Sequence, residues 1–312
     1  MHLIDLHCDT LYRAVTENLN IDSEEMNLQI NFSKNGKTMQ CFAIWLPDEY
    51  TSDMAEKTFL DSSKRIIDEC NRLNIPLISK DDIISDFFNN NKYTACFTVE
   101  NGKALNSKIE NIKKFSELGV KIMTITWNGR NEIGDGAGVE KSKGITQFGK
   151  QVIDEMEKNN IIVDISHASE NLFYDVAEIS KRPFIATHSN SYNVTKHKRN
   201  LTDEQFKVLI SQGGITGINF YKAFLNNNPD KATKFDILKH VEHFMALGGE
   251  NNISIGSDFD GCELPKDIKG GSSMDEIYEM FLMHNYNEDI IRKIFYENAL
   301  NFFENFDNQR IM

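Results

Sequence analysis

The sequence predicts a single (β/α)₈ barrel that extends over residues 1–312. Eight short apolar segments alternate with helical or helix-sized sequence along the whole chain. Neither a domain linker, a low-complexity run nor a solenoid-length repeat interrupts this alternation. A doubly wound open sheet would alternate in the same way, but the first strand is not followed by a phosphate-binding G-x-G-x-x-G loop. With 312 residues, of which 40% are hydrophobic, the chain is long enough for one barrel of this class.

The eight apolar segments have the length and composition of buried strands. The first begins at Leu3 and runs into His7 and Asp9, and Pro47 stops the second. The remaining expected strands cover 39–46, 94–99, 120–126, 161–165, 184–187, 214–220 and 252–256.

Apolar residues at helical spacing separate the strands. Gly119 and Gly248 stand where the C-caps of two of these helices are expected. The expected helices cover 59–73, 81–88, 109–118, 152–156, 172–179, 203–212, 237–245 and most of the sequence after strand eight, including 289–305. Residues 23–37 and 189–200 are expected to be polar loops.

The net charge limits the classes of binding partner, and the cysteines indicate the cellular compartment. The formal net charge of −13 and the pI near 5.1 argue against nucleic acid or an anionic membrane as a partner. The five cysteines form no C-x-x-C pair, and most lie in expected strands or helices, which indicates buried thiols. Because no secretory signal or transmembrane-length segment is evident, we expect a cytoplasmic protein. Whether it forms a homodimer is left open.

Candidate ligands follow five of the expected strands at their C-terminal ends. Each of them alone could be an ordinary turn residue or helix cap. In a barrel, however, these ends face one shared mouth, so their coincidence favours a metal centre. The candidates are His7, Asp9, Glu100, His167, His188 and Asp258.

Three imidazoles and three carboxylates suit a site for two cations, in which one carboxylate bridges the metals. Nitrogen and oxygen ligands without thiolates favour Zn²⁺, and they leave Mn²⁺, Fe²⁺ and Co²⁺ open. A water activated at such a site, together with a proton shuttle, is suited to amide hydrolysis.

Nine short motifs that occur in order along nearly the whole chain give the sequence a family resemblance. It resembles the membrane (renal) dipeptidase family of zinc metallopeptidases, in its soluble bacterial-type branch. The matching motifs are DLHCD (5–9), VENG (99–102), TITWN (124–128), GITQFG (144–149), VDISHAS (163–169), ATHSN (186–190), KRN (198–200), INFY (218–221) and GSDFDG (256–261).

The resemblance implies a role for each candidate. His7 and Asp9 would hold one zinc, His167 and His188 the other, and Glu100 would bridge them. Asp258 would orient the bridging hydroxide and pass its proton to the leaving amine. Arg199 and Tyr221 would bind the free carboxylate of a dipeptide.

The sequence departs from the family in one important position. Animal members have a substrate-contacting His where this chain has Trp127, so the group that stabilises the tetrahedral intermediate is unassigned. Asn128 could contribute, or it could satisfy local backbone groups. The histidines outside the motifs, among them His240, are expected at the surface or in packing, and Asp260 is expected to shape the turn after Asp258.

Two other functions compete with a dipeptidase. A deaminase or lactonase of the wider amidohydrolase group would typically begin with H-x-H and bridge its metals with a modified Lys. A non-catalytic metal-binding barrel would be favoured by loss of Asp258 or Arg199, and both are present. The preferred dipeptide is open, and dipeptides that end in a D-residue are among the candidates.

Overall fold

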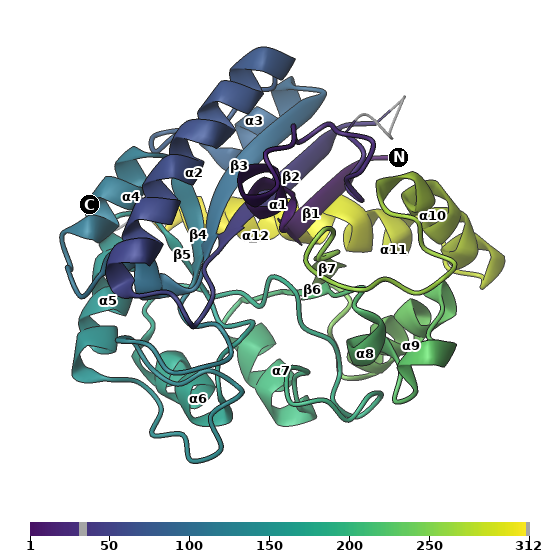
Figure 1. Cartoon of the computed structure of the whole chain (residues 1–312). Coiled ribbons are helices and arrows are strands. Elements are labelled where there is room, and N and C mark those ends of the chain that lie inside the picture. Colours follow the sequence, from purple (N-terminus) through teal and green to yellow (C-terminus); the bar gives the residue numbers. More distant parts are fainter. Residues whose placement is uncertain (31–35, 310–312) are drawn as a thin grey trace.

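The computed structural model describes residues 1–30 and 36–309, and its centre is a curled sheet of seven parallel strands. The order across the sheet is β5-β4-β3-β2-β1-β7-β6, and Figure 1 shows helices around its outside. The strands are β1 (Leu3–Cys8), β2 (Thr38–Trp45), β3 (Tyr93–Glu100), β4 (Val120–Thr124), β5 (Ile162–Asp164), β6 (Thr216–Ile218) and β7 (Ile253–Ile255). This arrangement confirms the predicted fold class.

Residues 184–187 close the gap between β5 and β6, but they are not a regular strand as predicted. Ile185 pairs with Asp164 on one side, and Ala186 pairs with Thr216 on the other, through isolated parallel bridges. The ladder ends there because side chains take the next backbone donors. The Asp164 carboxylate accepts from Thr187 N–H at 3.0 Å, and Ser166 Oγ accepts from His188 N–H at 3.1 Å. The eighth barrel segment is therefore fixed largely by side chains.

The helices follow the predicted order, with two additions. Helix α1 (Thr10–Thr16) begins directly after Asp9, and the short α8 (Lys222–Leu225) follows Tyr221; the sequence analysis expected neither. The other α-helices are α2 (Ser52–Leu73), α3 (Ile84–Asn90), α4 (Asn111–Glu117), α5 (Gln147–Lys158), α6 (Glu170–Ile179), α7 (Asp203–Ser211), α9 (Lys234–Ala246), α10 (Met274–Met283), α11 (Glu288–Arg292) and α12 (Asn298–Asn308). A π-helical turn, Lys293–Glu297, joins α11 to α12, so the predicted helix over 289–305 is one irregular helical segment.

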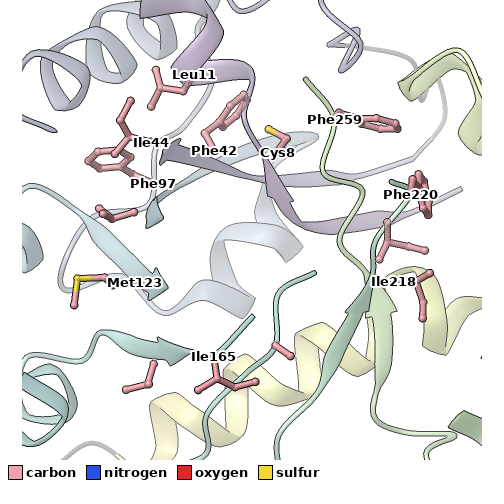
Figure 2. Packing of buried hydrophobic residues seen from close by; sticks show 14 of the residues in the cluster. Cys8, Leu11, Phe42, Ile44, Phe97, Met123, Ile165, Ile218, Phe220 and Phe259 are labelled. Carbon is pink, nitrogen blue, oxygen red and sulfur yellow. The ribbon is translucent and has the colours of Figure 1, made fainter. Parts of the chain in front are cut away.

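The two faces of a strand have different surroundings, as β3 illustrates. Phe97 packs outward against Phe59 of α2 at a ring distance of 5.8 Å, and Phe59 in turn lies 3.9 Å from Phe115 of α4. Alternation along the strand turns Thr98 and Glu100 toward the inside of the barrel. Figure 2 shows the buried cluster to which Phe97 belongs, between the strands and the surrounding elements. Outward packing on helices thus fixes the inward direction of Glu100.

A second apolar cluster lies toward the N-terminal ends of the strands. Helix α12, which crosses behind the strands in Figure 1, contributes Phe302, Phe303 and Phe306 to it. The same cluster includes apolar residues in or beside the barrel strands, among them Ile4, Leu6, Met39, Ile122, Ile162, Ile185 and Ile215. Because this end is filled with apolar side chains, polar groups gather at the opposite end.

Other sequence expectations can be compared with the same structure. Cys8, Cys41, Cys70 and Cys96 are buried free thiols as predicted, and Cys262 is half-buried. No helix in the described part of the chain is long and apolar enough to cross a membrane. Within the predicted loop 23–37, residues 31–35 lie outside the described residues, and the rest contains neither helix nor strand.

Candidate metal centre

All five predicted metal ligands meet at the C-terminal end of the barrel. His7 lies in β1 and Glu100 ends β3, whereas the others follow a strand or the 184–187 segment. Each is at most 6% exposed. Ligand atoms of His7, Glu100 and His188 lie within 4.8 Å of one another, as do those of His7, Asp9 and Asp258. The five predicted ligands are His7, Asp9, Glu100, His167 and His188.

Glu100 stands between two groups of donors. Its Oε2 lies 3.6 Å from His7 Nε2, whereas its Oε1 lies 2.7 Å from His167 Nε2 and 3.7 Å from His188 Nε2. The two carboxylate oxygens therefore face different imidazoles. Burial, together with the nearby Asp9, raises the pKa of Glu100 well above its usual value. A carboxylate whose two oxygens face separate donors in this way could bridge two cations.

Two imidazole nitrogens face each other without a proton between them. His167 Nδ1 lies 3.1 Å from Asn128 Oδ1, which can only accept, so Nδ1 carries the hydrogen. Thr187 Oγ1 donates to Asp164 and therefore accepts from His188 Nδ1 at 2.8 Å. Burial lowers the pKa of both imidazoles well below its usual value. Their bare Nε2 atoms nevertheless lie 3.0 Å apart, beside Glu100. Such a set of acceptors fits a cation.

His7 is surrounded by acidic groups. Its Nε2 lies 3.6 Å from Asp9 Oδ2 and 3.8 Å from Asp258 Oδ1. Burial alone would lower the pKa of His7, but Glu100, Asp9 and Asp258 together raise it to about 10. His7 Nε2 and Asp9 Oδ1 are buried without a hydrogen-bond partner among the described residues. A divalent cation would satisfy both atoms and take the place of the proton that the acids attract.

The convergence of His7 and Asp9 has a different cause from the one the sequence suggests. Strand alternation predicts that both side chains leave one face of one strand. Instead, β1 ends at Cys8, and its pairing with β2 shifts register between Asp5 and Cys8. Asp9 is the N-cap residue of α1, and its side chain makes no capping bond. A bulge and a helix start therefore aim the two ligands.

Asp258 lies beside the ligands on a strained backbone. Its φ is 62°, and a Cβ on the nearby Gly261 would lie 1.9 Å from Asp9 Oδ2 and 2.7 Å from Asp258 Oδ1. Only glycine at 261 leaves room for the two carboxylates. Asn219 Nδ2 donates to Asp258 Oδ2 at 2.9 Å and leaves Oδ1 facing His7. Burial raises the pKa of Asp258 to about 7.

The two predicted substrate-binding residues lie in the same pocket as the ligands. This pocket has a volume of about 800 Å³, and both Arg199 and Tyr221 line it together with Glu100, His167 and Asp258. Arg199 is 4% exposed, yet Nε, Nη1 and Nη2 have no hydrogen-bond partner within residues 1–30 and 36–309. Burial lowers the pKa of Arg199 to about 10, which leaves it charged at neutral pH. A buried guanidinium without a hydrogen-bond partner is unfavourable, so Arg199 is suited to binding an anion.

Two buried carboxylates that support the site escaped the sequence analysis. The Asp164 carboxylate accepts from the hydroxyls of Thr124, Ser166 and Thr187 at 2.5 to 2.6 Å, and through Thr187 it fixes the His188 ring. Asp5 accepts from Ser257 N–H at 2.8 Å and from Ser257 Oγ at 2.5 Å. Asp5 and Asp164 each lie in a strand that ends at, or just before, a predicted metal ligand. The sequence signal that could have identified them is a carboxylate within an otherwise apolar strand.

Two residues near the mouth make contacts that the sequence analysis did not predict. Asn128, which was expected to contribute to the reaction or to satisfy its local backbone, lines the pocket, and its Oδ1 faces His167 Nδ1, so it also orients an imidazole. Asp260 does more than shape its turn. Its carboxylate accepts from Thr10 Oγ1 at 2.5 Å, from Arg13 Nη1 at 2.9 Å and from Asn27 N–H at 2.8 Å. It thereby ties α1 and the following loop to the mouth.

His240 on α9 connects the two segments that carry Arg199 and Tyr221. The Ser191 N–H donates to His240 Nδ1 at 3.1 Å, so the Nε2–H donates to the Leu225 carbonyl at 3.1 Å. The first contact holds the 189–201 loop, and the second holds α8 directly after Tyr221. His240 was expected to be a surface or packing residue; it is buried and makes both contacts.

Replacing His240 by Phe, which keeps the volume of the ring but makes neither hydrogen bond, should raise KM for a substrate that binds through Arg199 and Tyr221. Two lost bonds of about 1 kcal/mol each predict a rise of up to roughly 30-fold. The metal content should not change, because no ligand is touched. His243→Gln on the same helix is the matched control, since His243 contacts Asp203 at 2.7 Å and not the loop. An unchanged KM in His240→Phe would contradict this positioning role.

Comparisons with known proteins identify the family. The model of the membrane dipeptidase family (peptidase family M19) matches residues 1–310. The chain belongs to this family. An uncharacterised dipeptidase of Schizosaccharomyces pombe is 32% identical over 195 residues, which make up 61% of this chain and 46% of that protein. An uncharacterised protein of Klebsiella pneumoniae is 27% identical over 216 residues, 66% of this chain and 80% of its own length.

Solved structures of M19 proteins share the fold. A metallopeptidase of Rhodobacter sphaeroides, liganded with a phosphinate mimic of L-Ala-D-Ala, matches with a TM-score of 0.90 at 23% identity. That match covers 98% of this chain and 99% of the other. The M19 dipeptidase AC has the same TM-score at 24% identity and covers 98% of both chains. M19 members are metallopeptidases, so a metal-binding role for the buried cluster agrees with the family.

Proposed function

We propose that this protein is a dipeptidase that uses two divalent metal ions to hydrolyse the peptide bond of free dipeptides. The observation that supports this most strongly is the pairing of two unsatisfied groups in one pocket. A cluster of buried acceptors that requires cations lies beside Arg199, a buried cation that requires an anion. A dipeptide offers a carbonyl to the first group and a free carboxylate to the second.

In this proposal His7 and Asp9 would hold one ion, His167 and His188 would hold the other, and Glu100 would bind both. Asn128 and Thr187 keep the two facing imidazoles in the tautomer that offers Nε2. Bound there, divalent cations would polarise the scissile carbonyl and lower the pKa of the attacking water. The nitrogen and oxygen donor set favours Zn²⁺ among the candidate metals.

Asp258 moves the proton in this proposal. Asn219 occupies its Oδ2, so Oδ1 is the oxygen directed at the ligand cluster. Attack of water on the carbonyl carbon releases a proton, and cleavage of the C–N bond needs one on the leaving nitrogen. Asp258 takes the first and delivers the second, which leaves a carboxylic acid and an amine that ionise to a carboxylate and an ammonium group.

Arg199 and Tyr221 limit the substrate to two residues. Both line the pocket, and Arg199 is close enough to the centre for Glu100 and Asp258 to act on its charge. A planar guanidinium binds a carboxylate through two parallel hydrogen bonds. With the α-carboxylate of the second residue held there, a longer peptide would have to continue into the buried Arg199.

Removing the guanidinium with Arg199→Ala should lower kcat/KM on a free-acid dipeptide by roughly 10²-fold. Loss of a charged hydrogen-bond partner costs about 1.5–3 kcal/mol, and 1.4 kcal/mol is tenfold. On the same dipeptide with an amidated C-terminus the mutation should cost much less, because the partner is already missing. Lys196→Ala, which removes a cation three residues away and outside the pocket, is the control. Equal losses on both substrates would show that Arg199 does not bind the carboxylate.

The proposed function is tested directly by metal analysis combined with a dipeptide panel. Protein purified without chelator should contain close to two equivalents of metal and should cleave free dipeptides but not tripeptides. Because the Rhodobacter sphaeroides relative is liganded with a mimic of L-Ala-D-Ala, the panel should include D-residues at the second position. Metal-loaded protein that cleaves no dipeptide would refute the proposal.

A further inference from the structure

Three aromatic side chains form a continuous surface on one side of the pocket. The rings of Tyr12 and Trp45 lie 4.8 Å apart at 72°, and those of Trp45 and Trp127 lie 5.0 Å apart at 59°. All three residues line the pocket that contains the ligand cluster and Arg199. We call Tyr12, Trp45 and Trp127 the aromatic wall. Neither the metal centre nor the carboxylate-binding pair uses it.

The barrel order places the aromatic wall across the mouth from Arg199. Trp45 ends β2, whereas Arg199 follows the 184–187 segment. Around the closed ring β1, β2, β3, β4, β5, 184–187, β6 and β7, these two positions are opposite each other. Trp45 is also the register partner of Glu100 on the neighbouring β3. The ligand cluster therefore lies between the aromatic wall and Arg199.

A bound dipeptide must extend toward this wall. Consecutive Cα atoms are about 3.8 Å apart, so a dipeptide is short enough for each of its groups to be placed. With the carboxylate at Arg199 and the scissile carbonyl at the ligand cluster, the first residue lies on the far side of the cluster. We propose that the aromatic wall binds the side chain of this first residue and selects aromatic or large aliphatic ones. This inference rests on the proposed function and adds the substrate class to it.

The charges on this side of the pocket support an apolar preference. Arg13 is the cation nearest to the wall in sequence, and its guanidinium contacts Asp260 and Glu17, each at 2.9 Å. The Arg13 charge is therefore already neutralised and is not available to bind an acidic side chain. Together, Arg13, Glu17 and Asp260 carry one net negative charge. An acidic first residue would be repelled there, and glycine would leave the ring faces uncovered. A Phe or Leu side chain would cover them.

The first test compares dipeptides that differ only in the first residue. With alanine second, kcat/KM for Phe-Ala and Leu-Ala should exceed that for Gly-Ala and Asp-Ala by about tenfold or more, the usual gain from burying a large apolar side chain. Trp45→Ala should reduce this ratio several-fold at unchanged metal content, and Trp45→Phe should restore most of it. Phe235→Ala on α9, an exposed aromatic outside the pocket, is the matched control and should leave the ratio unchanged.

The second test uses fluorescence and does not depend on turnover. The sequence contains two tryptophans, Trp45 and Trp127, so all indole emission comes from the aromatic wall. In metal-loaded Asp258→Asn protein, Leu-Ala should change this emission at lower concentration than Gly-Ala. If Trp45→Ala does not fold, this titration and the Trp127→Leu variant test whether the aromatic wall binds the side chain of the first residue.

The outcomes separate this inference from the proposed function. If metal-loaded protein cleaves no dipeptide at all, the proposed function fails, and the inference fails with it. If dipeptides are cleaved with equal efficiency whatever the first residue, the wall is not a specificity site, although the dipeptidase assignment stands. A preference for Phe-Ala that survives in folded, metal-loaded Trp45→Ala and Trp127→Leu would likewise overturn the inference.

Discussion

Replacing Glu100 by Gln should remove metal from both halves of the centre. The two carboxylate oxygens face different imidazoles, Oε2 toward His7 and Oε1 toward His167 and His188. A glutamine is neutral and has one acceptor and one amide nitrogen, so one half would meet a donor where it needs a ligand, and the other would lose the negative charge of its ligand. Elemental analysis should show less than one equivalent of metal in total, because both positions are weakened. Activity should fall by more than the roughly 10²-fold that loss of an outer-shell partner can cost.

Glu157→Gln provides the matched control for this prediction. Glu157 is also a buried carboxylate, but it accepts from the backbone of Lys181 and Arg182, and none of its contacts involves a ligand. Its loss should leave the metal content and the kinetic constants of folded protein unchanged. If Glu100→Gln keeps two equivalents of metal and full activity, Glu100 is not the bridge.

Replacing Asp258 by Asn should separate metal binding from chemistry. Five ligands remain, and the asparagine has the same shape and keeps one oxygen for the Asn219 amide, so metal content and fold should be retained. The proton carrier is lost, so kcat should fall by about 10²-fold or more. Metal analysis and kcat measured on the same preparation test both halves of the prediction.

Two results would contradict this role for Asp258. Full turnover by Asp258→Asn would show that another group carries the proton. Loss of metal would make Asp258 a ligand, an arrangement consistent with its grouping with His7 and Asp9. Because Asp258 has a positive φ, Asp258→Gly relieves the backbone strain and removes the carboxylate. If strain relief alone mattered, this variant would be more active than Asp258→Asn.

Periodicity and strand order were sufficient to predict the fold and the convergence of the candidate ligands. Apolar segments indicated the strands, and the barrel rule brought Glu100, His167 and His188 to one end. The sequence could not show how the last part of the ring closes. Residues 184–187 look like a strand, but the carboxylate of Asp164 and the hydroxyl of Ser166 take the backbone donors that follow. These tertiary hydrogen bonds, and not the local sequence, decide that residues 184–187 do not form a regular strand.

Local geometry at the site was the least predictable part. The pattern His7-x-Asp9 suggested strand alternation, whereas the structure has a bulge followed by a helix. Helix α1 was missed because seven residues are too few for a clear helical period. His240 gave no sequence signal, because its partners are a backbone N–H and a carbonyl 49 and 15 residues away.

The pairing of β1 has a consequence for the order in which the protein can mature. One edge of β1 pairs with β2, but the other pairs with β7 at Ile255, and Phe302, Phe303 and Phe306 of α12 complete the apolar cluster around Ile4 and Leu6. During synthesis, the strand that carries His7 leaves the ribosome before β7, so its second edge has no partner until Ile253–Ile255 has been made. The ring around the centre therefore closes only after translation has passed β7, and we expect full metal loading to follow that closure.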